Sequence, residues 1–491
     1  MKKFLFLFIT FLFTSSVYSQ FSMRKQSTVV RLPEEEDLEY YSKKDGWGAA
    51  AQVFGINMAV WGFNRYIANE DFARIGWNSV KTNFQKGFIW DNDLIGSNMF
   101  LHPYHGALYF NSARSRGFNF WESGLYNVAG SAMWEIFMEN EYPSTNDIIV
   151  TPLGGLALGE VFYRASDWAL DDRTRGTERF KNELIGFIIS PGRGLTRLLT
   201  GDAWKVRRTS GRQFGVPPIS VEASAGVRAL ELEDEILDQG IGAVFNLNLE
   251  YGDRYAHENI KPYDYFTIRA KIGIQASQPA LAQINITGRL WGAELVDSSK
   301  DFLGIGIYQH YDYYDSDTIS DVSNKIPYKM ANPVAAGVGL IHKSKRFSNW
   351  DFNSFVHLNA IILGGALSDH YEVSDRNYNI GSGFGLKAGI NISYRDIFAA
   401  SWWHDGFRLY TWKGYPKGTD LSTVDYSTLN AQGDKSNATL NTTNIKLDLK
   451  LHKHLYLTGV GSIYRRSTHY RDYEDVYSIT GEGQLMLTYK F

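Results

Sequence analysis

The last half of the chain consists of short segments in which apolar and polar residues alternate. From Ile219 to Arg228, apolar side chains alternate with polar or small ones, and Leu485, Leu487 and Phe491 repeat the pattern at the end of the chain. A period of two is typical of a β-strand with one apolar and one polar face. We count about twelve such segments between residues 219 and 491. This half is therefore predicted to be all β-structure.

The connections between these segments favour a membrane barrel over a soluble secreted β-sandwich. If the first strand rises from the periplasm, four of the six outward connections are longer than every inward one. Outer-membrane barrels have short periplasmic turns and long external loops, whereas sandwiches have no such asymmetry. The polar face also carries Arg, Lys, Glu and Asp, which suit a wet lumen. The outward connections are roughly 230–240, 276–280, 314–332, 367–379, 413–441 and 467–474.

The end of the chain resembles outer-membrane barrel proteins, because the last alternating strand ends on Phe491. In that class a terminal aromatic residue is the signal that the barrel-assembly machinery reads. The resemblance implies this machinery as a partner during biogenesis, outer-membrane lipids as the surroundings, and a location in the outer membrane of a Gram-negative envelope. We predict an α+β protein: an N-terminal α-helical domain followed by an antiparallel transmembrane β-barrel of about 12 strands.

The N-terminus has the pattern of an export signal. Lys2 and Lys3 precede the apolar run from Phe4 to Phe13, and small residues follow up to Ser19. The chain has no Cys, which excludes disulfides, thiolate metal sites and a lipid anchor on cysteine. A net charge of -3 excludes a basic surface for nucleic acid. The predicted domains are 1–19 (signal peptide), 20–46 (acidic flexible leader), 47–212 (helical domain) and 213–491 (barrel).

The helical domain is predicted from its apolar composition and small residues. We expect helices at about 47–67, 121–140, 150–170 and 180–200, with small residues in 151–160 that allow close helix packing. The apolar stretch from Trp47 to Ile67 is long enough to span a bilayer. A spanning helix behind a signal peptide would hold the chain in the inner membrane, so we interpret this stretch as a buried or interfacial helix.

Residues able to bind a metal or transfer protons fall in the same domain. His102 and His105 are three positions apart, and Glu135 and Glu160 lie on predicted helices, so together they could bind a divalent metal or form an acid–base pair. A His next to Ser112, Ser123 or Ser131 could activate a nucleophile. The alternative is that these groups are buried and join helices by hydrogen bonds. Catalytic candidates are His102, His105, Ser131, Glu135 and Glu160, metal candidates are His102, His105 and Glu135, and no cofactor is predicted.

Three motifs carry a second resemblance: His102-Pro-Tyr-His105, Ser131-Ala-Met-Trp-Glu135, and Gly154-Gly-x-x-x-Gly-Glu160. The region from Trp47 to Val206 resembles an uncharacterised family of outer-membrane β-barrel proteins with an N-terminal helical domain. The resemblance implies a barrel behind the helices and brings no activity, because the function of that family is unknown.

Two functions of different classes follow. The first is a non-enzymatic envelope protein whose helical domain is a plug or a periplasmic domain, with a narrow channel, a transport role or an envelope-maintenance role. The second is an envelope hydrolase acting on lipid, acyl or glycan substrates, with its site in the helical domain. The residues favour the first, because the chain has no His-Glu-x-x-His metal motif and no Gly-x-Ser-x-Gly nucleophile motif.

Overall fold

A computed structural model describes residues 43–491. Within this range it leaves out 208–212, 216, 233–234, 257–259, 276–277, 317–325, 345, 347 and 426–428. The predicted signal peptide and the leader up to residue 42 lie outside the described residues.

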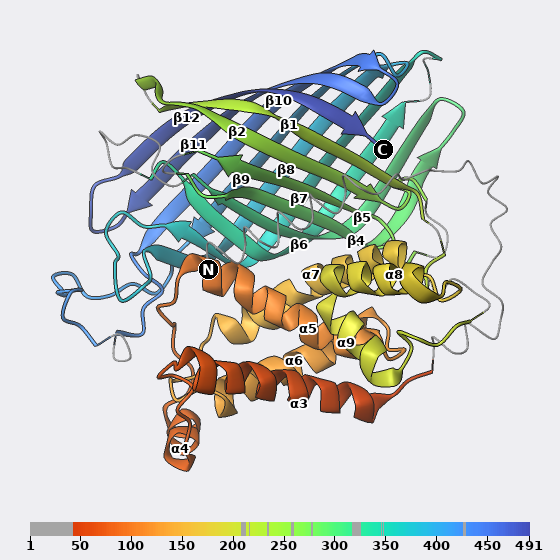
Figure 1. The fold of residues 1–491 in the computed structure, drawn as a ribbon. Coiled ribbons are helices and arrows are strands. Elements are labelled where there is room, and N and C mark those ends of the chain that lie inside the picture. Colours follow the sequence, from red (N-terminus) through yellow and green to blue (C-terminus); the bar gives the residue numbers. More distant parts are fainter. Residues whose placement is uncertain are drawn as a thin grey trace.

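The second half of the chain is a closed antiparallel barrel of twelve strands (Figure 1). Each strand pairs with its neighbours in sequence, and β1 closes the ring against β12. The predicted fold class is confirmed. The strands are β1 (Ile219–Leu232), β2 (Glu235–Tyr251), β3 (Phe266–Ile274), β4 (Leu281–Asp297), β5 (Asp301–Asp315), β6 (Lys329–Ser344), β7 (Trp350–Leu367), β8 (Tyr378–Tyr394), β9 (Phe398–Tyr410), β10 (Ser436–His452), β11 (Leu455–Tyr470) and β12 (Val476–Lys490).

The two ends of the barrel differ. At one end, which we call the turn end, β1 begins, β12 ends, and the connections are 252–265, 298–300, 345–349, 395–397 and 453–454. At the other end, the loop end, the longest connections are 316–328, 368–377 and 411–435. The strands extend further than predicted, so only 411–435 is longer than the longest turn-end connection, and the predicted loop 230–240 is mostly strand. By the general rule for these barrels, the turn end faces the periplasm.

The outer face of the barrel is apolar and the inner face is polar. On β12, Leu485 and Leu487 are half exposed on the outside, whereas Glu482 and Thr488 are buried in the interior. A closed ring leaves no unpaired strand edge, so the strands of the wall hydrogen-bond to one another and not to water. The closed ring and its apolar exterior place the barrel in an outer membrane.

The interior is filled in its loop-end half. Lys387 Nζ lies 2.6 Å from Asp312 Oδ1, and Lys271 Nζ lies 2.5 Å from Glu482 Oε2. Tyr314, Phe407, Leu440 and Tyr464 pack in a cluster of buried side chains in the same half. Towards the turn end a cavity of about 910 Å³ remains, lined by residues that include Glu222, Arg254, Lys343, Trp403 and Lys446. Among the described residues the lumen is therefore a cavity with one closed end.

The helices precede the barrel. They are α3 (Gly46–Phe63), α4 (Trp77–Lys86), α5 (His102–Arg114), α6 (Phe120–Phe137), α7 (Asp147–Ala169), α8 (Gly176–Ile189) and α9 (Pro191–Thr200), with π-helical turns η1 (Asn64–Ala68) and η2 (Ser97–Leu101). Helices were predicted near α3, α6 and α7. The predicted helix 180–200 is two helices, because Pro191 cannot continue α8. The sequence did not predict α4 or α5, which are short and mix polar with aromatic residues.

The helical domain packs against the outside of the barrel wall, beside β4 to β7 in Figure 1. On β5, Asp312 points into the lumen and Gln309 and Tyr311 point outward. Gln309 Nε2 donates to the carbonyl of Leu153 at 2.8 Å, and Tyr311 Oη donates to the carbonyl of Met99 at 2.6 Å.

One hydrophobic core joins the two parts. Phe110 and Leu158 of the helices pack in the same cluster as Ile286, Tyr311 and Tyr378 of the outer barrel face. The helical domain therefore does not fill the lumen, and the prediction that it is a plug is wrong. Alternation shows which side chains point outward, but it does not show which part of that outer face another segment covers.

Candidate metal centre

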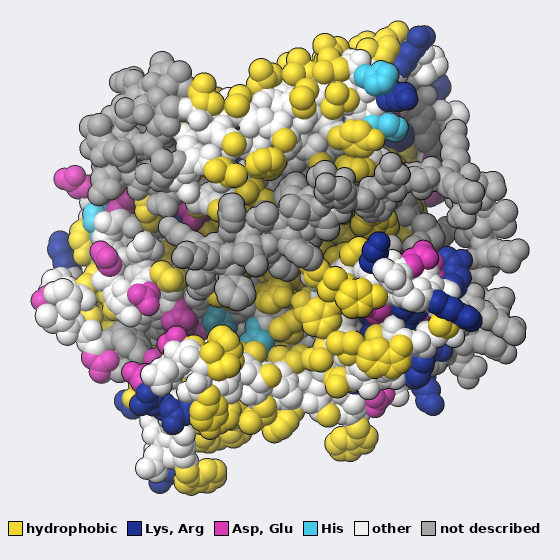
Figure 2. Space-filling view, viewed as in Figure 1, with side chains coloured by type: hydrophobic (Ala, Val, Ile, Leu, Met, Phe, Trp, Pro, Cys, Tyr) yellow, Lys and Arg dark blue, Asp and Glu magenta, His cyan; other side chains and the backbone are white. Residues whose placement is uncertain are grey.

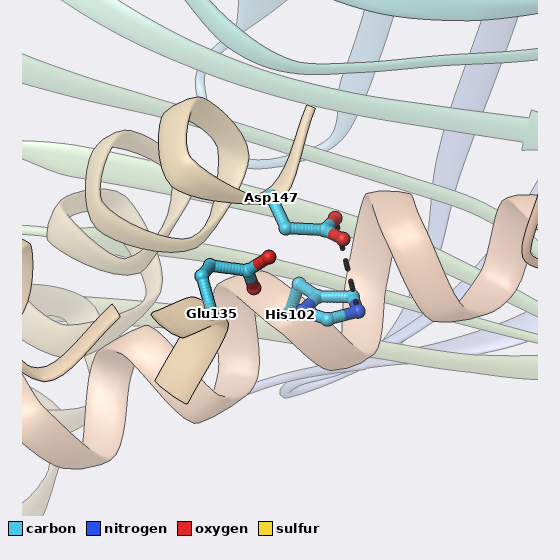
Figure 3. A group of neighbouring side chains, drawn as sticks. All are labelled: His102, Glu135 and Asp147. Atoms are coloured by element: carbon cyan, nitrogen blue, oxygen red, sulfur yellow. Dashed lines mark ion pairs between the residues drawn. The ribbon is translucent and has the colours of Figure 1, made fainter. Parts of the chain in front are cut away.

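Three potential metal ligands converge at the loop end of the helical domain. His102 is the first residue of α5, Glu135 lies near the end of α6, and Asp147 is the first residue of α7. One ligand atom of each lies within 4.8 Å of the others, and both carboxylates point towards the imidazole (Figure 3). The distance from His102 Nε2 to Asp147 Oδ1 is 3.7 Å. Glu135 and Asp147 are buried, and the His102 side chain is 17% exposed.

Glycines bring the three helices close enough for this convergence. A Cβ on Gly106 of α5 would lie 2.0 Å from the carbonyl oxygen of Thr151 on α7. A Cβ on Gly155 would lie 2.7 Å from the backbone of Gly106. A side chain at either position would push α5 and α7 apart, and with them His102 and Asp147. This contact explains the small residues of the Gly-Gly-x-x-x-Gly-Glu motif.

Backbone and side-chain hydrogen bonds hold the carboxylates in place. The Ser144 amide donates to Glu135 Oε2 at 2.8 Å, and the Asp147 amide donates to Ser144 Oγ at 3.1 Å. Asn146 Nδ2 lies 3.0 Å from Asp147 Oδ1. His102 Nδ1 lies 3.5 Å from Thr151 Oγ1, which leaves Nε2 as the nitrogen that faces Asp147.

Asp91 is a further carboxylate of the same cluster. Its Oδ1 accepts hydrogen bonds from Asn98 Nδ2 at 2.6 Å and from Asn146 Nδ2 at 2.9 Å. Burial would raise the pKa of Asp91, but a hydrogen bond from Asp147 and the nearby imidazole of His102 hold this pKa below its usual value.

Glu139 completes the acidic surroundings. It lies in the connection between α6 and α7, and Trp134 Nε1 donates to its Oε1 at 2.5 Å. Burial raises the pKa of Glu139 to about 8, although the Trp134 hydrogen bond acts in the opposite direction. Glu139 therefore holds a proton that an ordinary carboxyl group loses well below neutral pH.

This acidic cluster has no basic partner among the residues that the structure describes. No Lys or Arg pairs with the carboxylates of Asp91, Glu135, Glu139 or Asp147, and the single nitrogen base in contact is His102. Burying a charge without a partner is costly, so such groups stay protonated or bind a cation.

The donor set fits a divalent transition metal. Two ligands of a tetrahedral ion, each about 2.1 Å from the metal, are about 3.4 Å apart. The three ligand atoms lie within 4.8 Å of one another, so each pair would approach by at most about 1.4 Å on binding. One imidazole with two carboxylates favours Zn²⁺ or Mn²⁺ over Mg²⁺ and Ca²⁺, which prefer oxygen ligands alone. Three protein ligands leave a coordination position for water or another ligand.

The other predicted site residues lie outside this convergence. His105 Nε2 is 2.9 Å from Tyr109 Oη, and its ring packs on the edge of Trp134. Ser131 Oγ donates to the backbone oxygen of Asp147 at 3.4 Å, so it is not paired with a histidine. Glu160 is held by Arg114 Nε and Arg164 Nε at 2.8 Å each. It lies thirteen positions beyond Asp147 on α7, about 20 Å along the helix.

Ser112 and Ser123 do not complete a nucleophile either. Ser112 Oγ donates to the carbonyl of Leu108 at 2.8 Å, and the buried Ser123 Oγ has no hydrogen-bond partner in the described part of the chain. The serine–histidine pair that a hydrolase needs is thus not formed by these candidates.

Sequence reasoning found His102 and Glu135 but missed Asp147 and Asp91. Asp147 stands in the first turn of a helix, where an acidic residue is common for reasons of helix stability alone. Asp91 lies in an irregular segment between α4 and α5, far from any motif. Only the packing of α5, α6 and α7 brings these residues together.

Comparison with known families identifies the region around this centre. Residues 87–192 match DUF3943, described as a domain of unknown function. The chain contains a DUF3943 domain. The DUF3943 domain includes α5, α6, α7 and α8, and with them His102, Glu135 and Asp147. This match confirms the resemblance to an uncharacterised family and adds no activity. No match is found among curated proteins.

Solved outer-membrane proteins resemble the barrel behind the DUF3943 domain. The NanC porin has a TM-score of 0.28 and 7% identity, and the match covers 55% of this chain and 100% of that one. The toluene transporter TodX of Pseudomonas putida has a TM-score of 0.21 and 8% identity, with 55% and 88% covered. The outer membrane channel DcaP of Acinetobacter baumannii has a TM-score of 0.23 and 8% identity, with 56% and 96% covered. The closure of the ring and its apolar exterior, not these low scores, identify an outer-membrane barrel.

Proposed function

We propose that this protein is a metal-binding, non-enzymatic outer-membrane protein with an envelope-maintenance role. Its DUF3943 domain binds one divalent transition-metal ion at His102, Glu135 and Asp147. The observation that carries the proposal is the convergence of these ligands in a buried acidic cluster without a Lys or Arg partner. A bound cation would balance the buried charge and tie α5, α6 and α7 together at the loop end.

In this proposal the barrel anchors the metal-binding domain and is not a channel. The ion pairs Lys387–Asp312 and Lys271–Glu482 cross the loop-end half of the lumen, where a buried side-chain cluster also packs. The helical domain is attached to the outer wall, so its metal centre is not connected with the lumen cavity. Transport through the barrel would require these buried groups to separate.

The hydrolase alternative has less support. None of the predicted serine nucleophiles lies in a hydrogen bond with His102 or His105, and Glu160 is neutralised by Arg114 and Arg164. The matched family is described as a domain of unknown function and lends no support to an enzyme. A metal with a free coordination position still allows hydrolysis in principle, so ester hydrolysis by the metal-loaded protein should be assayed together with metal content.

The test is the amount of metal that the purified full-length protein retains. After incubation with Zn²⁺ and removal of unbound ion, the wild type is expected to hold about one Zn²⁺ per chain by inductively coupled plasma mass spectrometry. Glu135→Gln and Asp147→Asn each remove one ligand charge with little change of shape. Both are expected to lose most of the bound ion, with the same barrel migration on unheated gels as the wild type.

His105→Gln is the matched control. His105 lies one helical turn from His102 and is buried to a similar degree, but it contacts Tyr109 and Trp134 instead of the carboxylates. The variant is expected to bind Zn²⁺ like the wild type. A wild type without bound metal, or loss of metal from His105→Gln but not from Asp147→Asn, would refute the proposal.

A further inference from the structure

The helical domain is built with polar residues inside and apolar residues outside. On α6, Trp121, Leu125 and Val128 are 59%, 70% and 47% exposed and follow one helical stripe. On the same helix, Asn127 and Ser131 are almost completely buried. Water-soluble helices have the opposite arrangement, with their polar stripe towards solvent.

The neighbouring helices repeat this arrangement. Phe54 and Met58 are exposed on α3, whereas Gln52 and Asn57 on the same helix are buried. On α8, the exposed apolar positions Phe180, Leu184 and Phe187 are again one helical turn apart. Figure 2 shows hydrophobic side chains over the visible face of α3, α8 and α9.

The buried polar groups join helices to one another. Gln52 Nε2 donates to the carbonyl of Gly192 at 2.9 Å, and Asn57 Nδ2 donates to the carbonyl of Gly130 at 3.1 Å. Asn127 Nδ2 donates to the carbonyl of Pro152 at 2.8 Å. Interhelical hydrogen bonds and close glycine contacts hold helices together where lipid surrounds them, because the hydrophobic effect does not favour their association there.

The exposed apolar surface continues the lipid-facing surface of the barrel. Away from the helices, outward side chains such as Leu358 and Ile445 are more than half exposed. Beside the helices, the same kind of outward position is covered, and Tyr311 and Tyr378 are fully buried against the domain. The helices thus lie against the part of the barrel wall that lipid would otherwise contact. Their own outer face is the exposed apolar surface there.

The direction and length of α7 fit a bilayer. Its first residue, Asp147, lies at the loop end, where Arg376 donates to the carbonyl of Asp91, and near its other end Arg164 donates to the carbonyl of Pro262 in a turn-end connection. Its 23 residues span about 35 Å, slightly more than the hydrocarbon core of a bilayer. Among the described residues it is the one helix long and apolar enough to cross a membrane by length and composition.

Charged side chains lie at both ends of the domain. Exposed Arg173, Arg175, Lys181 and Lys205 lie at the turn end, and both acidic and basic side chains lie at the loop end around α4 (Figure 2). Between these ends, the face that Figure 2 shows carries mostly hydrophobic and uncharged side chains.

We infer that the helical domain lies inside the outer membrane beside the barrel, with lipid acyl chains as the partner of its exposed face. The domain and the barrel wall form one transmembrane unit, and His102, Glu135 and Asp147 lie near the outer-leaflet end of its helices. The sequence interpretation of Trp47 to Ile67 as a buried or interfacial helix changes accordingly: α3 faces lipid, next to a barrel that already brings the chain to the outer membrane. The inference concerns the exterior of the domain and is independent of metal binding in its interior.

The absence of Cys from the chain allows a direct test. Single cysteines replace Leu125 and Phe54, carry a nitroxide label, and are measured in phospholipid vesicles for collisions with oxygen and with a water-soluble nickel chelate. Three labelled controls are Leu358→Cys on the barrel exterior, Asn248→Cys in the lumen cavity, and Lys417→Cys in a loop. The labels at 125 and 54 are expected to match Leu358→Cys, with oxygen collisions several-fold more frequent than nickel collisions.

Two results would overturn the inference. Frequent nickel collisions at 125 and 54, as at Lys417→Cys, would place the helices in water. Few collisions with either reagent would place a protein partner or a second copy of the chain on this face. If a label disturbs folding, brominated lipids can be used to quench the native tryptophan fluorescence of the unlabelled protein. Trp121 is expected to be quenched by these lipids, and Trp121→Phe is expected to lose that part of the quenching.

Discussion

Helix α7 carries the buried carboxylate of Asp147 at its first residue and that of Glu160 in its second half, and these two regions, the Asp147 end and the Glu160 end, balance the charge differently. Glu160 is held between Arg114 and Arg164 at 2.8 Å each. Asp147 is also buried, but among the described residues its carboxylate meets no Lys or Arg; it lies 3.7 Å from His102 Nε2 and accepts a hydrogen bond from Asn146 Nδ2 at 3.0 Å. One end therefore contains its own counter-charge, whereas the other needs protons or an external cation.

The buried acids of the barrel lumen are paired with basic side chains, as Glu160 is. Each of the buried acids Asp312, Asp405 and Glu482 in the lumen has a Lys or Arg partner at 2.5 to 2.8 Å. At the loop end of the helical domain, by contrast, several buried acids of the described chain lie together without a Lys or Arg partner. This difference is the reason to assign the metal centre there and not to the more numerous charges of the lumen.

The largest expected effect is at the Arg-paired end. Glu160→Gln leaves two guanidinium groups buried with one carboxylate fewer, and is expected to lower the free energy of unfolding by about 3–5 kcal/mol. Denaturant unfolding in detergent, followed by circular dichroism, measures the loss. Asp147→Asn in metal-free protein is the comparison, and it is expected to change stability by less than about 1 kcal/mol because no cation loses its partner. Equal losses at both positions would show that the two ends do not differ.

A bound metal is expected to stabilise the unpaired end. With free Zn²⁺ at about 100 times its Kd, the wild type gains about 2.7 kcal/mol in the free energy of unfolding, which EDTA removes. Glu135→Gln should show no such gain, while Glu160→Gln, although less stable, should retain it if it folds. The same Zn²⁺ effect in wild type and Glu135→Gln would mean that the ion binds elsewhere.

Over a single pH unit, a smaller effect is expected from the titration of Glu139. The pKa of Glu139 rises from 4.5 to about 8, so between these values the unfolded chain binds fewer protons than the folded one. The stability contributed by this group is complete below about pH 4.5 and falls as pH rises towards 8, by at most about 1.4 kcal/mol per pH unit. In metal-free protein, Glu139→Gln should flatten this decline. An unchanged slope in the variant would show that Glu139 is not the group that titrates.

The smallest expected effect is in the lumen. Planar-bilayer recordings of the wild type are expected to show no steady conductance, since ion pairs and packed side chains fill its loop-end half. Replacing Lys387 and Asp312 together by Met and Leu should leave the barrel closed, because apolar side chains of similar size fill the same space. Regular conductance steps in the wild type would contradict an anchoring role for the barrel.

The barrel could be predicted from sequence because lipid and lumen impose a period of two on each strand. Leu485, Leu487 and Phe491 show this period in the last strand without reference to other residues. The position of the helical domain could not be predicted, because an outward Tyr311 has the same pattern whether lipid or a helix covers it. The charge pattern did not indicate the position of the helical domain either, because the polar residues of the domain are spread over several helices.

The metal centre was predictable only in part. His102 and Glu135 stood out as residue types within motifs, while Asp147 had a sufficient explanation as a helix-terminal acid. His105 and Glu160 looked equally suitable in sequence. The packing of α5 against α6 and α7 directs His105 to Tyr109, and Arg114 and Arg164 neutralise Glu160.

The most direct test of the metal centre is X-ray diffraction from crystals of the Zn²⁺-loaded full-length protein at wavelengths on both sides of the zinc absorption edge. We expect one strong anomalous peak between His102 Nε2 and the carboxylates of Glu135 and Asp147, absent from Asp147→Asn crystals. No peak in the helical domain, or a peak at His105 instead, would contradict the assignment of the unpaired acidic cluster as a metal site.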